Sequence, residues 1–190
     1  MKTIEIKGSK RTALTKQSVK AIRNDEQSPC VLYGGKEPVH FSVTLADLKG
    51  LVYTPDVHMV KLNIDGAEYQ CVLQDIQFHP VTDVIQHVDF LQVFDDKPVT
   101  INIPVRLTGA SEGVKQGGKL VTKVRRLKVK ALPAKLPDAV TIDITPLKIG
   151  GHIRVRDLNV DGVTFLDSQS NVIVGVQTTR NVVAAEADKK

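Results

Sequence analysis

The chain has 190 residues, 42% apolar and 25% charged, which is typical of a globular protein and excludes a disordered one. Its two cysteines are too few for a disulfide scaffold, so we expect reduced thiols in a cytoplasmic protein. The longest run without charges, Ser168–Thr179, is much shorter than a membrane span, and the charged N-terminal segment is unlike a signal peptide.

Charge is distributed unevenly, although the net charge is only +5. Residues 1–24 carry seven basic side chains and one acidic side chain, whereas residues 25–95 carry three basic and eleven acidic side chains. The segment Lys115–Lys135 holds eight basic residues and no acidic one. Two basic clusters favour a polyanionic partner such as nucleic acid, but charge alone is equally compatible with a solvated surface.

The first half of the chain alternates apolar and polar residues with the period of β-strands. The expected strands cover residues 3–7, 30–33, 39–43, 59–64, 69–73 and 84–93. Asp65-Gly66 is a dipeptide typical of tight hairpin turns. Two helices are predicted, Lys16–Arg23 after the N-cap Thr15 and Leu45–Val52 after Thr44.

A charged segment ending in a proline, Asp95–Pro98, indicates a domain boundary. Further strands are expected at residues 99–107, 120–132, 140–144 and 172–176. We therefore predict two β-rich domains, residues 1–95 and 96–184, followed by a flexible tail at residues 185–190. Both predicted helices lie in the first domain.

The first helix combines a basic side with an apolar side. Lys16, Lys20 and Arg23 follow one another at helical spacing, where they repel each other unless an anion is present. Val19 and Ile22 share the opposite side and can pack on a sheet. This pattern is compatible with a contact to a phosphate backbone or with an ordinary solvated helix face.

The motif Tyr33-Gly34-Gly35-Lys36 follows a predicted strand. Its glycines allow a close approach to a ligand, while the tyrosine and the lysine offer a stacking ring and a charge. The same four residues are equally typical of a hairpin turn with a buried tyrosine.

Residue patterns for catalysis or cofactor binding are weak. Gly113–Lys119 matches seven positions of a phosphate-binding loop, but Leu120 replaces the required Ser or Thr. His87 and Asp89 are two apart on a predicted strand and can form an acid–base pair, yet no nucleophile accompanies them. We expect no cofactor, no metal site and no enzymatic activity, and a hydrolase using this pair is the least favoured hypothesis.

Taken in order, several motifs resemble one family. They are the basic segment ending in Arg23, P-C-V-L-Y-G-G-K (29–36), Q-D-I-Q-F-H-P (74–80), Q-H-V-D-F (86–90) and G-G-H-I-R-V-R-D-L (150–158). The chain resembles the bacterial large-subunit ribosomal proteins that bind 5S rRNA, in their long two-domain general stress form. This resemblance implies a mainly β fold, with an N-terminal β-barrel and a few helices followed by a mostly β C-terminal domain. It also implies a structural constituent of the large ribosomal subunit that stabilises 5S rRNA.

The resemblance also implies which residues contact RNA. They are Arg11, Lys16, Lys20, Arg23, Tyr33, Lys36, Gln74, His87 and Asp89. Cations neutralise phosphates, whereas the other side chains can read 2′-hydroxyls and base edges. The expected partners are 5S rRNA and other components of the large subunit, with no membrane and no small-molecule substrate.

The sequence departs from the family pattern in three places. The glycines that are common in the segment around Thr15–Ala21 are missing, and two single residues differ. Ala21 and Phe78 stand where an arginine is often found, so we expect weaker RNA binding than in a fully basic relative. An alternative function is a stress-linked, ribosome-associated interaction module that acts through the C-terminal domain. In that domain the basic side of residues 120–132 can lie on rRNA or simply face solvent.

Overall fold

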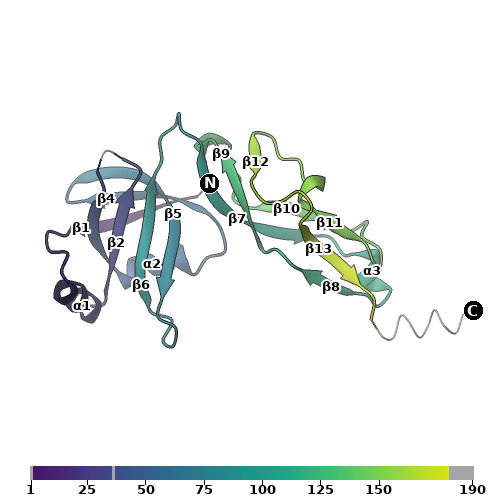
Figure 1. The fold of residues 1–190 in the computed structure, drawn as a ribbon, viewed down its shortest axis with the longest axis horizontal. Coiled ribbons are helices and arrows are strands. Elements are labelled where there is room, and N and C mark those ends of the chain that lie inside the picture. The colour runs from purple at the N-terminus through teal and green to yellow at the C-terminus, as the bar shows by residue number, and fades with distance from the viewer. Residues whose placement is uncertain (1, 36, 180–190) are drawn as a thin grey trace, which may run out of the picture. The chain divides into compact units, whose positions relative to one another are not determined.

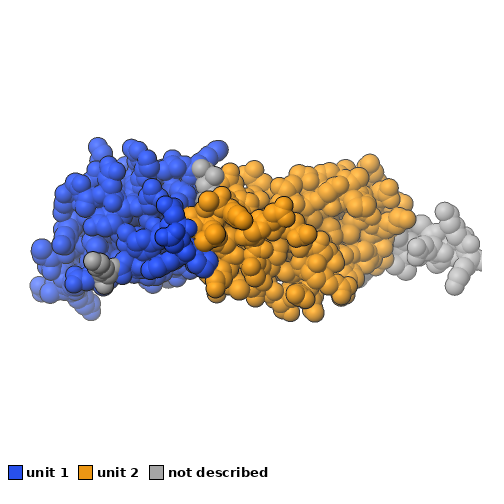
Figure 2. Space-filling model, turned by 90° about the horizontal axis from the view of Figure 1, so that it is seen from above, with its two compact units in different colours: residues 1–99 blue, residues 100–190 orange. Residues whose placement is uncertain are grey.

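The computed structural model describes residues 2–35 and 37–179. The chain divides into two compact units that meet between Val99 and Thr100, shown in blue and orange in Figure 2. The predicted tail, residues 185–190, lies outside the described residues. Both units are built mainly from β-strands, which confirms the expected fold class (Figure 1).

Unit 1 is a closed β-barrel, as the family resemblance implied. Its strands are β1 (Lys2–Lys10), β2 (Gln27–Tyr33), β3 (Val39–Thr44), β4 (His58–Ile64), β5 (Ala67–Phe78) and β6 (Ile85–Gln92). They follow one another around the barrel in the order β1-β3-β2-β6-β5-β4. The pairs β1–β4 and β2–β6 are parallel, and the other pairs are antiparallel. Closure leaves no free sheet edge, so the outer surface of the barrel is defined by side chains.

The barrel is filled by inward-facing apolar side chains, because every second residue of a strand points to the same side. Phe41 and Phe90 are fully buried, and their ring centroids lie 5.9 Å apart. Burying two aromatic side chains contributes several kcal/mol of stability, of the order of 3 kcal/mol each. The next residues along the strands face outward, and the candidate site is built from these.

Two helices lie outside the barrel, and both agree with the sequence-based prediction. Helix α1 (Lys16–Asn24) begins after Thr15, whose hydroxyl accepts a hydrogen bond from the Ser18 N–H at 3.3 Å. None of its residues is fully buried, and Val19 and Ile22 are half-buried on the helix that packs beside β2. The helix is therefore mostly exposed to solvent.

Helix α2 (Leu45–Val52) is anchored by Leu48 and Leu51, which are buried in the core of unit 1. Thr44 occupies the N-cap position, but its hydroxyl donates to Asp47 Oδ2 at 2.6 Å instead of capping a backbone N–H. The hairpin between β4 and β5 turns at Asp65 and Gly66, whose φ angles of 48° and 91° agree with the predicted tight turn.

Unit 2 contains two sheets with the strand orders β10-β7-β9-β12 and β11-β13-β8. The strands are β7 (Val99–Thr108), β8 (Lys119–Thr122), β9 (Arg126–Ala131), β10 (Val140–Asp143), β11 (His152–Arg154), β12 (Val163–Phe165) and β13 (Val172–Gln177). Helices are not confined to the first half as predicted, since α3 (Glu112–Lys115), η1 (Pro133–Lys135) and η2 (Val155–Asp157) occur here. Each has at most four residues, too few for a helical sequence pattern.

The single strand predicted at residues 120–132 is wrong, because the chain changes sheets in the middle of it. The N–H of Lys123 donates to the carbonyl of Ile173 on β13, whereas the carbonyl of Arg125 accepts from the N–H of Val105 on β7. The alternating pattern therefore continues through two short strands, β8 and β9, that belong to different sheets.

The segment resembling a phosphate-binding loop has a packing role instead. A Cβ atom at Gly113 would lie 2.7 Å from the backbone nitrogen of Ile149, and one at Gly118 would lie 2.7 Å from the Gly113 carbonyl. Such distances exclude a side chain. Gly113 allows α3 to pack closely against the backbone of residues 148–149, and Gly118 allows the chain before β8 to pack against α3. The segment is followed by strand β8, whereas a phosphate-binding loop is followed by a helix.

Candidate functional site

The outer surface of β6 carries a bonded pair of polar side chains. His87 and Asp89 are two residues apart, and their side chains are 29% and 31% exposed. His87 Nδ1 lies 2.7 Å from Asp89 Oδ1, a charge-assisted hydrogen bond that holds the imidazole ring in place. Because Nδ1 is occupied, Nε2 is the ring atom left for an external partner. The two-residue spacing in the sequence thus predicted their common face correctly.

The neighbouring strand β5 adds two polar residues that the sequence analysis missed. Asp75 is paired with Asp89 in the antiparallel register, and Gln77 is paired with His87. Both are exposed. We call these four residues the β5–β6 outer face. The same two-residue period could have identified Asp75 and Gln77, but their cross-strand partners depend on a register that the sequence does not specify.

Gln74 lies at an irregularity of this register, between the pairs that Leu73 and Asp75 make with β6. A bulge leaves the extra residue without a partner across the ladder and redirects its side chain. The Gln74 Oε1 atom is buried and has no hydrogen-bond partner among the described residues. A buried acceptor left without a donor is unfavourable by about 1–3 kcal/mol, which an external donor would relieve.

Tyr33 ends β2 beside the β5–β6 outer face. Burial raises the pKa of its hydroxyl, and the nearby carboxylates of Asp89 and Asp75 raise it further. The phenol is therefore held as a hydrogen-bond donor close to both carboxylates. After it, Gly34 adopts a φ of +97°, which ends the strand. The ligand-contact and turn interpretations of this motif are thus compatible, because the turn presents the tyrosine at the strand end.

Arg11 lies next to β3, immediately after β1. Its backbone N–H donates to the His40 carbonyl at 2.9 Å, and its Nη2 donates to the Ala13 carbonyl at 3.4 Å. The Nε atom is buried and has no partner within the described part of the chain. A buried guanidinium N–H without an acceptor is costly, so this atom is a second candidate contact for an external group.

The buried thiol of Cys30, on β2, is influenced by two charged side chains of opposite sign. Burial raises the pKa of its thiol to about 12, the positive charge of Arg11 lowers it, and the negative charge of Asp89 raises it. Both charged groups therefore lie near this one buried strand residue. The strand register agrees with this. The Arg11 N–H donates to the carbonyl of His40. Val31 of β2 is paired with His40 on one side and with Asp89 on the other, although 78 positions separate Arg11 from Asp89 in the sequence.

The basic residues of α1 are exposed beside β2. Arg23 Nη2 donates to the backbone carbonyl of Gln86 at 3.0 Å, which ties the end of the helix to β6. Lys16 and Lys20 make no ion pair with any described residue. The structure therefore links α1 to the strand that carries His87, while Lys36, also predicted to contact RNA, lies outside the described residues.

The two positions that depart from the family pattern are both exposed. Ala21 lies on α1, and Phe78 ends β5 with 43% of its surface accessible. The adjoining β5–β6 connection also exposes Val81 (83%) and Val84 (46%). Thr82 and Asp83 are exposed in the same connection, which contains no lysine or arginine and so adds no permanently charged cation to the site.

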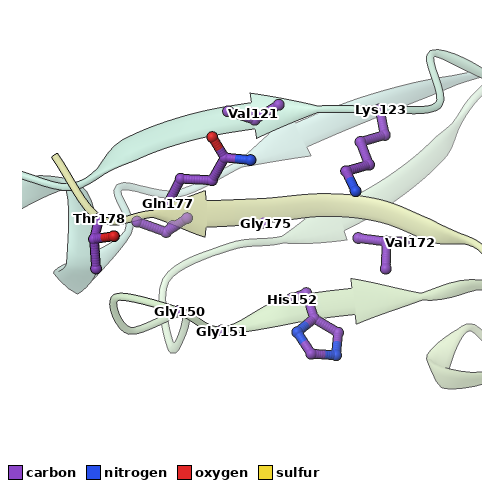
Figure 3. A pocket seen from close by; sticks show the side chains of 10 residues that line it. Val121, Lys123, Gly150, Gly151, His152, Val172, Gly175, Gln177 and Thr178 are labelled. Carbon is purple, nitrogen blue, oxygen red and sulfur yellow. The ribbon is translucent and has the colours of Figure 1, made fainter.

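Unit 2 has a shallow hollow of about 400 Å³ on the sheet β11-β13-β8. Figure 3 shows Lys123 and His152 on either side of β13, with Gly175 between them on that strand. A Cβ atom at Gly175 would lie 3.2 Å from the Gly151 carbonyl, so glycine lets the strands approach closely. The residues that line this hollow include no carboxylate and no cysteine or serine.

Residues 2–35 and 37–179 contain no cluster of three or more histidine, cysteine, aspartate or glutamate side chains placed to hold a metal ion. Within the same residues, no helix has the length and apolar character that crossing a membrane requires.

The two units match models of two ribosomal protein domains. Residues 6–90 match the Ribosomal L25p family, and residues 98–180 match the C-terminal domain of ribosomal protein TL5. Because both of its units match ribosomal domains, this chain of a closed barrel followed by a second β unit is a ribosomal protein. This class agrees with the expectation of a structural protein that is not an enzyme.

Relatives narrow this class further. The chain is 49% identical to the large ribosomal subunit protein bL25 of Amoebophilus asiaticus, an alignment covering 100% of this chain and 98% of the relative. It is 47% identical to bL25 of Christiangramia forsetii, over 98% of this chain and 86% of the relative. It is 44% identical to bL25 of Porphyromonas gingivalis, over 100% of both chains. The chain belongs to the bL25 family of large ribosomal subunit proteins, in its two-domain form.

Proposed function

We propose that this ribosomal protein binds 5S rRNA through the β5–β6 outer face, Tyr33, Arg11 and the basic side of α1. The observation that carries the proposal concerns buried side-chain atoms without a hydrogen-bond partner. The described residues contain four such atoms, and two of them, Arg11 Nε and Gln74 Oε1, belong to residues that the family resemblance assigns to the RNA site. One atom is a donor and the other an acceptor, so a ligand offering both kinds of group would satisfy them. The 2′-hydroxyl and base edges of RNA offer both.

Such a face suits the minor groove of double-stranded RNA, which is wide and shallow and displays 2′-hydroxyls. His87 Nε2 and the Tyr33 hydroxyl can reach groove atoms, and the carboxylates of Asp75 and Asp89 can accept from hydroxyl or amino groups. Carboxylates repel phosphates, so they contribute specificity and not affinity.

The charge of unit 1 supports these separate roles, in which polar groups provide specificity and basic groups provide affinity. Residues 1–99 contain eleven basic and thirteen acidic side chains, so the unit as a whole does not attract RNA. The attraction is supplied locally by Arg11, Lys16, Lys20 and Arg23, which neutralise phosphates. We therefore expect tight binding only where the outer face and the basic residues engage one RNA segment together.

The test is a titration of the full-length protein with 5S rRNA and with tRNA at several salt concentrations. We expect tighter binding to 5S rRNA, and we expect Tyr33→Phe to weaken that binding about fivefold to tenfold by removing one hydroxyl. Tyr69→Phe is the matched control. Tyr69 is half-buried like Tyr33, but it lies near the start of β5, outside the proposed site. Equal affinity of the wild-type protein for both RNAs would refute the proposal.

The same proposal gives the protein a structural role in cytoplasmic ribosomes.

A second candidate function is a stress-linked, ribosome-associated module that acts through unit 2. It is favoured by the charge of that unit, which has twelve basic and six acidic side chains between residues 100 and 179. The test compares ribosome occupancy of wild-type protein and the double variant Tyr33→Ala/His87→Ala in growing and heat-stressed cells. Occupancy of the variant that persists only under stress supports the module, and loss in both conditions opposes it.

A further inference from the structure

Strand β9 presents a row of three cations on the exposed side of its sheet. Its residues alternate strictly, with Arg126, Lys128 and Lys130 exposed and the residues after each of them buried. Because strand residues two apart point to the same side, the cations follow one another at about 6.6 Å along the strand. We call these three residues the β9 basic face.

Within the described part of the chain the three cations form no ion pairs, although one carboxylate lies beside the strand. No carboxylate among the described residues forms an ion pair with Arg126, Lys128 or Lys130. Asp167 lies beside the strand, but its Oδ2 accepts from the backbone N–H of Lys128 at 2.7 Å. Asp143, on β10 at the edge of the same sheet, is bonded to the hydroxyl and N–H of Thr145.

The strands on either side of β9 extend the exposed surface without adding negative charge. Thr164 of β12 is paired with Lys130, and on β7 the exposed residues include Asn102 and Arg106. Hydroxyl and amide side chains are among the groups that donate hydrogen bonds to phosphate oxygens. The β9 basic face is therefore the centre of an open, hydrogen-bonding and positively charged sheet surface.

We propose that the β9 basic face binds the phosphate backbone of ribosomal RNA, as a contact separate from the site in unit 1. Three like charges along one strand repel each other, and a regularly charged polyanion relieves that repulsion at every residue. In a ribosomal protein, RNA is the polyanion at hand. This inference rests on family membership and on unit 2, and it does not depend on the proposed 5S rRNA site.

The first experiment locates RNA directly. Cys30 and Cys71 are both buried, so a cysteine introduced by Lys128→Cys is the accessible thiol of the described chain and can carry an iron–EDTA group that generates hydroxyl radicals. The full-length protein is assembled into large subunits that lack it, and backbone cleavage is mapped on all rRNAs. Lys115→Cys is the matched control, because α3 lies at the end of unit 2 away from β9 (Figure 1).

We expect the group at position 128 to cleave the rRNA backbone at sites that the group at position 115 does not cleave. The positions of these cleavage sites show whether 5S rRNA or the larger rRNA is contacted. Absence of cleavage from position 128 overturns the proposal and indicates that protein or solvent covers this face. The wild-type protein, treated with the same reagent, measures the background.

The second experiment measures the electrostatic contribution. The variant Arg126→Gln/Lys128→Gln/Lys130→Gln should bind large subunits roughly 50-fold more weakly at physiological salt, and its salt-dependence slope should fall by about 2. The control Lys115→Gln/Lys119→Gln/Lys148→Gln removes the same charge from exposed positions on α3, β8 and a loop. An equal loss in the control overturns the proposal, since net charge would then explain the effect. Binding to isolated 5S rRNA is measured in parallel, so failure of the unit 1 site is recognised independently.

Discussion

His87 and Asp89 form a fixed pair on the outside of the barrel, with Nδ1 and Oδ1 2.7 Å apart, and both side chains remain about one-third exposed. The carboxylate orients the imidazole and directs its other nitrogen toward whatever binds the face. Asp75, directly across the strand pair, places a second carboxylate next to the first. A ligand must therefore offer donors to this surface, which makes the face selective.

Asp89→Asn should reduce selectivity more than affinity. The substitution removes the charged acceptor of His87 Nδ1. It also removes one negative charge that would repel the phosphates of the proposed RNA ligand. We expect the preference for 5S rRNA over tRNA to fall about tenfold, while binding to tRNA becomes slightly tighter. Glu68→Gln, an exposed carboxylate at the other end of β5, is the control. An unchanged ratio of the two affinities would contradict the assigned role.

Lys16→Gln/Lys20→Gln should lower the salt dependence of 5S rRNA binding. Each lost phosphate contact reduces the slope of log K against log salt by about 0.7–0.9, so we expect a decrease of about 1.5 for the pair. Lys7→Gln/Lys61→Gln is the matched control, because β1 and β4 lie across the barrel from β6 and β2 in the strand order. The slopes are obtained from affinities at four or more salt concentrations. Equal slopes for the two double variants would exclude α1 from the interface.

Gly34→Ala should destabilise the barrel by about 1–2 kcal/mol, because Gly34 has a φ of +97° that alanine adopts with strain. A Cβ atom there would also lie 2.8 Å from Leu91 Cδ1. Gly50→Ala is the control, since Gly50 lies inside α2 with no atom within 4 Å of a Cβ, and there alanine should stabilise by about 0.5–1 kcal/mol. Urea unfolding measures both. Equal free energies of unfolding would contradict the strained turn.

The stability of the protein should decrease above pH 9 through Cys30. Burial raises the pKa of this thiol from 9.0 to about 12, so the unfolded chain loses the proton first. The stabilisation is complete below pH 9 and is lost as the pH rises toward 12, at up to about 1.4 kcal/mol per pH unit. In the Cys30→Ala variant, the free energy of unfolding should therefore fall less steeply with pH than in wild type, by up to about 1.4 kcal/mol per pH unit. Parallel curves for the two proteins, measured by urea unfolding, would show that Cys30 contributes nothing to it.

Several features followed from local sequence alone. The two-residue period located the barrel strands, since alternation depends only on which residues prefer the interior. Thr15 predicted the start of α1, because capping involves neighbouring residues, as the bond to Ser18 confirms. The common face of His87 and Asp89 also followed from their spacing.

Other features depend on contacts between distant segments, and only the tertiary structure decided them. The pairing of Asp75 with Asp89 requires a particular register, and the unpartnered Gln74 Oε1 results from an irregularity in that register. The proximity of Arg11 to this face requires the pairing of β1 with β3, two strands that are separated by helix α1 and strand β2 in the sequence. Alternation identifies a strand but not its partners, because the period is the same in every sheet. The sequence therefore predicted one strand at residues 120–132, where the chain in fact divides between two sheets.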